Sequence, residues 1–233
     1  MSYTRLVSAL TAVAIVGVQS MAATPTTGAA QAAPVRGTQQ LDLAQLLAQG
    51  KLKPVNREVS ALKDRSGAVY MNENAGNGVV WIAGTDFAQG SIELDVRGRD
   101  VMQRSFVGVA FHARDDNTYE AVYLRPFNFR NPDVARRENA VQYIALPDYD
   151  WARLRKEYPS EFENPVGESM EPTGWVPLRI VVAAKSVQVY VGAVASPTLE
   201  VRSLGIHDRG LIGLWTGNGS DGAFANLRLT SGK

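Results

Sequence analysis

Leu178–Val191, with the sequence LRIVVAAKSVQVYV, is the stretch that decides the fold class. Its apolar residues alternate with polar ones at a period of two, and Gly210–Trp215 and Ala223–Leu229 continue the pattern beyond intervening turn residues. This alternation is typical of antiparallel strands that bury one face. The C-terminal third of the chain therefore predicts an all-β domain built as a β-sandwich.

Six further strand-like runs precede this region, and no long helical segment interrupts them. They are Val55–Ala61, Ala68–Met71, Val79–Ile82, Ser91–Arg97, Phe106–Ala113 and Thr118–Arg125. Asn77-Gly78 and Asp115–Asn117 separate neighbouring runs with residues that tight hairpins prefer. The pattern favours an antiparallel sandwich over a parallel α/β sheet. Leu41–Leu47, with Asp42 near its start, predicts one short helix.

The N-terminal segment has the features of a bacterial export signal. Arg5 supplies a positive charge, Leu6–Val18 is an apolar run too short to span a bilayer, and Ser20-Met21-Ala22 resembles a cleavage site. We expect a signal peptide at 1–22, a disordered tether at 23–40 and one folded domain at 41–233. The mature protein is then expected in the periplasm or outside the cell.

Composition narrows the class of partner. The chain has no cysteine and two histidines, His112 and His207, so an ordinary zinc site is not expected. A formal net charge of +1 does not suggest a nucleic-acid partner, which usually needs a basic face, and favours a neutral ligand. No further apolar run reaches membrane-spanning length, so we expect no membrane insertion. Nothing in the sequence predicts an oligomeric state.

The strand Ser91–Arg97 carries the first candidate for catalysis. In a strand, Glu93, Asp95 and Arg97 share one face, and two carboxylates on a face could supply the acid and nucleophile of a glycosidase. The spacing is similar to the E-x-D-x-E strand of laminarinase-type retaining glycosidases, with Arg97 where that family has its second catalytic glutamate. The alternative is an ordinary polar strand face on which Arg97 neutralises Asp95.

The hairpin expected between residues 106 and 125 carries a candidate sugar site. Tyr119, Tyr123 and Arg125 project from one face of its second strand. The matching face of the first strand offers a floor of Gly108, Ala110 and His112. Aromatic rings with a few convergent polar groups suit a sugar, because sugar C–H faces pack on rings. The alternative is a tyrosine-rich sheet surface with Arg125 tethering a loop.

Residues 126–175 interrupt the strand rhythm. They predict one strand, Ala140–Ala145, and one short helix, Asp150–Tyr158. Long insertions in compact domains are often functional, so we expect this one to fold back over the sheet. Trp151 is either a stacking platform or a hydrophobic anchor for the loop. Further residues of the insertion that can reach the sheet are Arg136, Arg137, Arg153 and Glu161.

The glycine-rich loop at residues 216–222 has two interpretations. Asn218 and Asp221 could place oxygen ligands around a calcium ion, or the loop is simply a hairpin turn. No other cofactor is expected.

Residues 106–128, the Gln142-Tyr143 strand and residues 210–229 resemble secreted bacterial concanavalin-like domains. The resemblance is to the group labelled 3-keto-disaccharide hydrolase or laminarinase-like and, more loosely, to laminin-G modules. It covers Asn56–Thr230. It implies a concanavalin A-like antiparallel jelly-roll with a carbohydrate-facing concave sheet and a long, partly helical insertion.

These patterns favour an exported protein that binds or processes a neutral oligo- or polysaccharide. The expected ligand-binding residues are Tyr119, Tyr123, Arg125, Asn128, Gln142, Tyr143, Trp151, Trp215 and Asn218. An enzyme would be a glycoside or keto-glycoside hydrolase whose acid and base come from Glu93, Asp95, Glu120 and His112. A third possibility is a laminin-G-like interaction module, which would show an exposed apolar patch.

Overall fold

The computed structural model describes residue 1, residues 33–34 and residues 37–232. The expected signal peptide and most of the expected tether lie outside these residues. The folded part begins earlier than expected, because Thr38–Leu41 forms strand β2 and pairs with the strand near the C-terminus.

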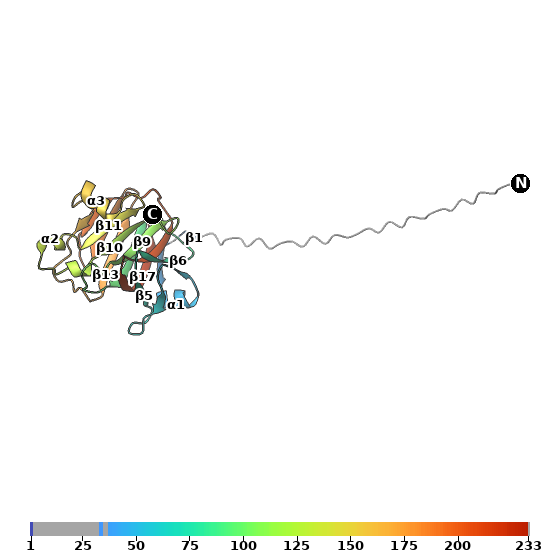
Figure 1. The fold of residues 1–233 in the computed structure, drawn as a ribbon, viewed down its shortest axis with the longest axis horizontal. Helices are drawn as coiled ribbons and strands as arrows, with labels where there is room; N and C mark the ends of the chain where they lie inside the picture. The colour runs from blue at the N-terminus through green and yellow to red at the C-terminus, as the bar shows by residue number, and fades with distance from the viewer. Residues whose placement is uncertain (2–32, 35–36, 233) are drawn as a thin grey trace. The chain divides into compact units, whose positions relative to one another are not determined.

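Two antiparallel sheets pack face to face over one hydrophobic core (Figure 1). The seven-stranded sheet has the order β12 (Glu163–Asn164), β11 (Val141–Leu146), β10 (Tyr119–Leu124), β9 (Val107–Ala113), β16 (Leu211–Thr216), β6 (Gly78–Ile82) and β3 (Leu52–Val55). The eight-stranded sheet has the order β15 (Leu199–Arg202), β14 (Ser186–Val191), β13 (Val176–Val182), β8 (Gly90–Arg97), β17 (Ser220–Ser231), β5 (Val69–Asn74) and β4 (Val59–Ala61), and β2 also pairs with β17. The predicted antiparallel sandwich is confirmed.

The smaller elements lie outside these two sheets. Strand β1 (Ala33–Pro34) pairs in parallel with β7 (Thr85–Asp86). The helices are α1 (Leu43–Ala48), the 3₁₀ turn η1 (Pro126–Asn128), α2 (Val134–Arg137) and α3 (Trp151–Glu157). Figure 1 shows α2 and α3 on the side of the molecule where β10 and β11 lie. None of the helices in the described part of the chain has the length and apolarity of a membrane span.

Alternation of apolar residues explains why the sheets stack. On β8, Ile92, Leu94 and Val96 are buried in the core while the residues between them are partly exposed. Full burial of one such side chain contributes about 1.5–3 kcal/mol, and the cysteine-free chain repeats this gain on every long strand. The core therefore supplies the stability that disulfides provide in many exported domains.

The predicted helix starts are confirmed by their caps. Asp42 accepts a hydrogen bond from the Gln45 amide at 2.8 Å, and Asp150 accepts one from the Arg153 amide at the same distance. Each carboxylate satisfies an amide of the first turn, which has no partner within the helix. The expected helix Asp150–Tyr158 is observed as α3 with these two residues as its caps.

All three predicted breaks between strands are observed, but only one of them is a hairpin. The hairpin at Asp115–Asn117 is confirmed, since β9 and β10 pair across it. Asn77-Gly78 instead joins β5 to β6, and the 216–222 loop joins β16 to β17, so both segments cross from one sheet to the other. The predicted single strand Val55–Ala61 is also divided between the sheets, because Asn56 takes a positive φ of 53° between β3 and β4.

Arg57 explains how these crossovers are held together. Its guanidinium is buried and donates hydrogen bonds to the carbonyl oxygens of Gly76 and Gly217, each at 2.8 Å. One side chain therefore links two crossovers that are far apart in the sequence. Burial lowers the pKa of Arg57, and the nearby Glu73 carboxylate opposes that effect.

Candidate functional site

A pair of aromatic rings marks the centre of the outer face of the seven-stranded sheet. Tyr123 on β10 and Trp215 on β16 both lie opposite Gly108 on β9, and their ring centroids are 4.8 Å apart. A Cβ atom on residue 108 would lie 2.0 Å from the Val122 carbonyl oxygen. Glycine at this position therefore lets the strands approach and brings the rings together.

The aromatic floor continues from this pair across the sheet. Trp215 Nε1 donates to the Tyr119 hydroxyl at 3.1 Å, and Trp81 packs edge-on against Tyr119 with 5.6 Å between ring centroids. Trp81 Nε1 in turn donates to Asp116 Oδ1 at 2.7 Å. Burial raises the pKa of Tyr119. We call these four residues the aromatic floor: Trp81, Tyr119, Tyr123 and Trp215. Each of them is at most 5 % exposed, so the floor is a rigid base with little free ring surface.

Trp151 supplies the free aromatic surface. It is the first residue of α3, it is 50 % exposed, and the Arg155 guanidinium lies 5.3 Å from its ring centroid. The helix is anchored by Leu154, which is 1 % exposed. Of the two interpretations of Trp151, this exposure favours the stacking platform over the anchor.

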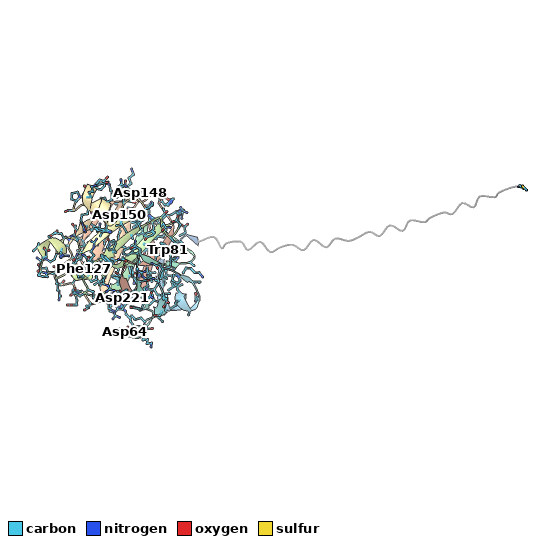
Figure 2. The ribbon with its side chains drawn as sticks, in the orientation of Figure 1. Asp64, Trp81, Phe127, Asp148, Asp150 and Asp221 are labelled. Atoms are coloured by element: carbon cyan, nitrogen blue, oxygen red, sulfur yellow. The ribbon has the colours of Figure 1, made fainter. Side chains whose placement is uncertain are left out.

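Two depressions over the aromatic floor share Asn77, Tyr123, Trp151 and Trp215 and so form one groove. The acidic end, of about 600 Å³, is lined by Asp116 and Asp150. The basic end, of about 340 Å³, is lined by Arg125, Arg136 and Arg155, with Asn128 and Asn218 beside them. Figure 2 labels Trp81 of the floor, Asp150 of the acidic end and Phe127 of the basic end, which belong to β6, to the N-cap of α3 and to η1.

Arg125 organises the basic end. It is buried and donates to the Tyr123 hydroxyl at 3.0 Å, to Gln142 Oε1 and to the Asn139 carbonyl at 2.9 Å. Glu163 Oε2 lies 3.6 Å from its Nη1 atom. Burial lowers the pKa of Arg125, while Tyr123 and Glu163 raise it. The structure thus brings together three of the expected ligand-binding residues and adds Asn139 and Glu163.

Two amide atoms in this network have no hydrogen-bond partner within the described residues. Gln142 Nε2 is buried and unpaired, because the other end of the amide accepts from Arg125. Asn128 Nδ2 donates to the Asn139 carbonyl at 3.1 Å, which leaves Asn128 Oδ1 buried without a donor. Buried polar atoms are usually paired, so these two are unusual.

His112 is a correction to the expected small-residue floor. Gly108 and Ala110 do face the groove side, but β9 bulges opposite Leu211–Gly213, and His112 adopts a φ of 55°. The extra residue reverses the alternation, so His112 turns into the interior. Its Nδ1 lies 2.7 Å from Glu120 Oε1, and its Nε2 donates to the Ala88 carbonyl at 2.6 Å.

Glu120 and Tyr143 also lie on the inner side of the seven-stranded sheet. The Tyr143 hydroxyl contacts Glu120 Oε2 and accepts from the Leu204 amide at 2.8 Å, and Ser203 Oγ donates to Glu120 at 2.9 Å. Burial first, and then Glu120, raises the pKa of Tyr143 well above its usual range. Tyr143 is therefore not a groove residue, because Gln142, its neighbour in the strand, takes the outward position.

Glu93 and Asp95 lie on the outer face of the eight-stranded sheet, away from the groove. Their shared face with Arg97 is confirmed, but Arg97 does not neutralise Asp95. Arg97 contacts Asp64 at 3.3 Å, while Asp95 pairs with Arg65. The four expected catalytic residues are thus divided between this face and the sandwich interior, and none of them lines the groove.

The glycine-rich loop places its polar residues in separate contacts. Asn218 lines the basic end of the groove and accepts from the Gly76 amide at 2.7 Å. Asp221 accepts from the Tyr70 hydroxyl at 2.8 Å and pairs with Arg99 at 2.6 Å. The calcium interpretation is therefore left without a free carboxylate in this loop, and no cluster of three acidic or histidine ligands occurs among the residues that the structure describes.

Of the other residues expected from the insertion, one lines the groove and two form ion pairs. Arg136 lines the groove, Arg153 pairs with Glu157, and Glu161 pairs with Arg202. Trp81 and Asp116 were not expected at the site. Alternation within the run Val79–Ile82 could have indicated the outward position of Trp81.

No family model and no curated protein matches the chain. Solved structures do match, at low sequence identity. The carbohydrate-binding module CBM66 from Bacillus subtilis is 10 % identical with a TM-score of 0.55, covering 77 % of this chain and 96 % of that one. A native glycosidic hydrolase is 10 % identical with a TM-score of 0.55, covering 87 % and 99 %. The exoplasmic/lumenal domain of VIP36, bound to calcium and Man3GlcNAc, is 10 % identical with a TM-score of 0.52, covering 79 % and 85 %. Together with the two antiparallel sheets, these matches show that the chain has the concanavalin-like lectin and glucanase β-sandwich fold.

Proposed function

We propose that the protein binds an oligosaccharide in the groove. The observation that carries this proposal is the half-exposed Trp151 ring above the aromatic floor. A sugar ring can stack its C–H face on the indole while its hydroxyls reach polar side chains along the groove. Two of the fold neighbours are named for carbohydrate binding or for a bound saccharide, which supports the proposal by analogy.

The size and lining of the groove support an oligosaccharide over a single small ion. Its two ends measure about 600 and 340 Å³, within the range of small-molecule sites. Asn77 lies where the two ends meet and Asn218 at the basic end, so amide groups are available along the length of a bound chain. Amides both donate and accept, which suits sugar hydroxyls.

We propose binding without cleavage as the main activity. Glycosidases of the common kind need two carboxyl groups that flank the scissile bond. The carboxylates of the groove already hold structural hydrogen bonds, since Asp116 accepts from Trp81 and Asp150 caps α3. Glu93 and Asp95 lie on the other sheet, and Glu120 is fully paired in the interior.

The test compares Trp151→Ala with Ile206→Ala, another exposed apolar residue that lies outside the groove. We expect Trp151→Ala to weaken binding roughly tenfold to a polysaccharide that slows the wild-type protein in the gel. The reason is that a stacking contact contributes about 0.5–1.5 kcal/mol beyond buried area. Ile206→Ala should bind as the wild type does. Affinity electrophoresis measures both, and equal binding by all three proteins would contradict the site assignment.

Mass spectrometry of the same mixtures tests the absence of cleavage. We expect intact adducts and no shortened saccharides after prolonged incubation. Shortened products that depend on Asp116 or Asp150 would overturn binding as the main activity and identify a hydrolase.

We also propose that the protein is exported before it binds its ligand. The apolar run Leu6–Val18 and the small residues that follow it support this. Expression with a C-terminal tag should give a periplasmic or secreted form shortened by about 22 residues, the length of the signal peptide in the sequence. A full-length cytoplasmic form would contradict export.

A further inference from the structure

The basic end of the groove carries an excess of positive charge. Arg125, Arg136 and Arg155 line it, and among the described residues no aspartate or glutamate does. Glu163, which is not part of the lining, lies 3.6 Å from Arg125 and 2.6 Å from Arg155, and Asp133, also outside the lining, lies 3.5 Å from Arg136. Three guanidinium groups are therefore paired with only two carboxylates.

Arg57 adds a further positive charge beside this end. It is buried next to Gly217, which lines the basic end. Its guanidinium donates to neutral oxygens, those of Asn56, Thr216, Gly76 and Gly217. No carboxylate in the described part of the chain forms an ion pair with it, and the nearby Glu73 pairs with Arg99 and Arg104. Its charge therefore adds to the field at the basic end.

Asn128 shows that a hydrogen-bond donor is missing at the same place. It lines the basic end and is 4 % exposed, and its amide is oriented by the bond from Nδ2 to the Asn139 carbonyl. Oδ1 is then an acceptor without a donor. A ligand hydroxyl beside the guanidinium groups would satisfy it, because a sugar hydroxyl is a good donor.

We propose that the saccharide held in the groove carries an anionic group, a carboxylate or a sulfate, at the basic end. This inference rests on the proposed function and names its substrate class: an acidic oligosaccharide in place of the neutral glycan expected from net charge. A ring stacks on Trp151, and the anion lies against Arg136 and Arg155, whose planar guanidinium groups match such oxyanions. Asp116 and Asp150 repel a second anion at the other end, so the charged residue fixes the direction of the chain.

The experiment is affinity electrophoresis of the full folded domain in gels that contain one polysaccharide each. The acidic probes are polygalacturonate, alginate and a sulfated galactan; the neutral probes are fully methyl-esterified pectin, an unsubstituted galactan and a β-glucan. Esterified pectin keeps the polygalacturonate backbone and removes its charge. The first variant is Arg136→Gln, in which the lost side chain is half exposed, pairs with Asp133 and has one further contact, from Nη1 to Met102 Sδ at 3.5 Å. The second is Arg228→Gln on the outer face of the eight-stranded sheet.

We expect retardation by at least one acidic probe, a loss of about fivefold or more in Arg136→Gln, and no loss in Arg228→Gln. Retardation should also weaken as salt is added, because the contact is between charges. Carboxylated and sulfated gels distinguish the two possible anions.

Three results would overturn the inference. Retardation in neutral gels alone, lost in Trp151→Ala and unchanged in Arg136→Gln, would leave the proposed function standing and refute the acidic ligand. Equal losses in Arg136→Gln and Arg228→Gln would indicate unspecific attraction to charge. Migration unaffected by all six polysaccharides would refute both the inference and the proposed function.

Discussion

The two faces of the seven-stranded sheet differ in how completely their polar side chains are hydrogen-bonded. On the inner face, Glu120 receives hydrogen bonds from Ser203 and Tyr143 and contacts His112 at 2.7 Å. On the outer face, Asn128 and Gln142 each keep an amide atom without a partner. The inner network, which contains Glu120 and His112, is complete, whereas the outer one is open. The groove in which we propose a saccharide therefore lies on the face where hydrogen bonds are unfinished.

The inner network also fixes which nitrogen of the His112 ring carries a hydrogen. The Ala88 carbonyl can only accept, so His112 Nε2 is protonated. The ring's other nitrogen, Nδ1, is held by its 2.7 Å contact with Glu120 Oε1. Both ring nitrogens therefore hold structural contacts, and Glu120 is 1 % exposed.

The largest expected effect comes from breaking the inner network. Glu120→Ala leaves a buried imidazole and two hydroxyl groups without their acceptor, and removal of one partner of a buried pair typically costs about 3–5 kcal/mol. Urea unfolding measures the loss. The matched control is Glu161→Ala, whose ion pair with Arg202 is half exposed and should contribute less than about 1 kcal/mol. Equal losses in the two variants would show that the inner network is not a stabilising core.

Two further variants, one on each face of the sheet, should have opposite effects on stability and on saccharide binding. Tyr143→Phe removes one hydroxyl from the inner network and should lower the free energy of unfolding by about 1–3 kcal/mol. Saccharide binding should not change, because Tyr143 lies on the other side of the sheet from the groove. Trp151→Ala should do the opposite, with weaker binding and nearly unchanged stability, since the ring is half exposed. Calorimetric titration alongside urea unfolding checks both, and a binding defect in Tyr143→Phe would contradict the separation.

Period-two alternation predicted most of the outer face from sequence. Tyr119 and Tyr123 are predicted on one face of the second hairpin strand, and the structure places both on the aromatic floor. The same rule failed at His112, because the bulge depends on the pairing of β9 with β16, which lies about a hundred residues further along the sequence. Alternation is a local signal, and a bulge is set by a partner strand.

The positive charge at the basic end of the groove could not be predicted from sequence either, because it also depends on contacts between distant segments. The net charge of +1 favoured a neutral ligand, yet Arg125, Arg136 and Arg155 converge on one end of the groove. Arg125 directly follows β10, Arg136 lies in α2 and Arg155 in α3, and only the folding of residues 126–175 over the sheet brings them together. A sum over the chain contains no information on where charges meet.

The smallest loss of stability is expected at the Tyr70–Asp221 contact near the surface. It is the counterpart of the buried Tyr143–Glu120 contact, since both join a tyrosine hydroxyl to a carboxylate. Burial first, and then the Asp221 carboxylate, raises the pKa of Tyr70 to about 12 from its ordinary value of 10.0. A raised pKa means that the folded state keeps its proton when the unfolded chain has lost it. The stabilisation is therefore complete below about pH 10 and is lost as the pH rises toward about 12.

Tyr70→Phe should remove the dependence of unfolding free energy on pH that the Tyr70 hydroxyl causes, with little loss of stability. Solvent screens this partly exposed contact, so we expect a loss of less than about 1 kcal/mol at neutral pH. The difference in unfolding free energy between wild type and Tyr70→Phe should shrink between about pH 10 and pH 12, and taking the difference cancels the titration of the other tyrosines. A difference that stays constant over this range would show that the Tyr70–Asp221 contact does not stabilise the fold. A loss as large as that of Tyr143→Phe would show that exposure does not separate the two hydroxyl–carboxylate contacts.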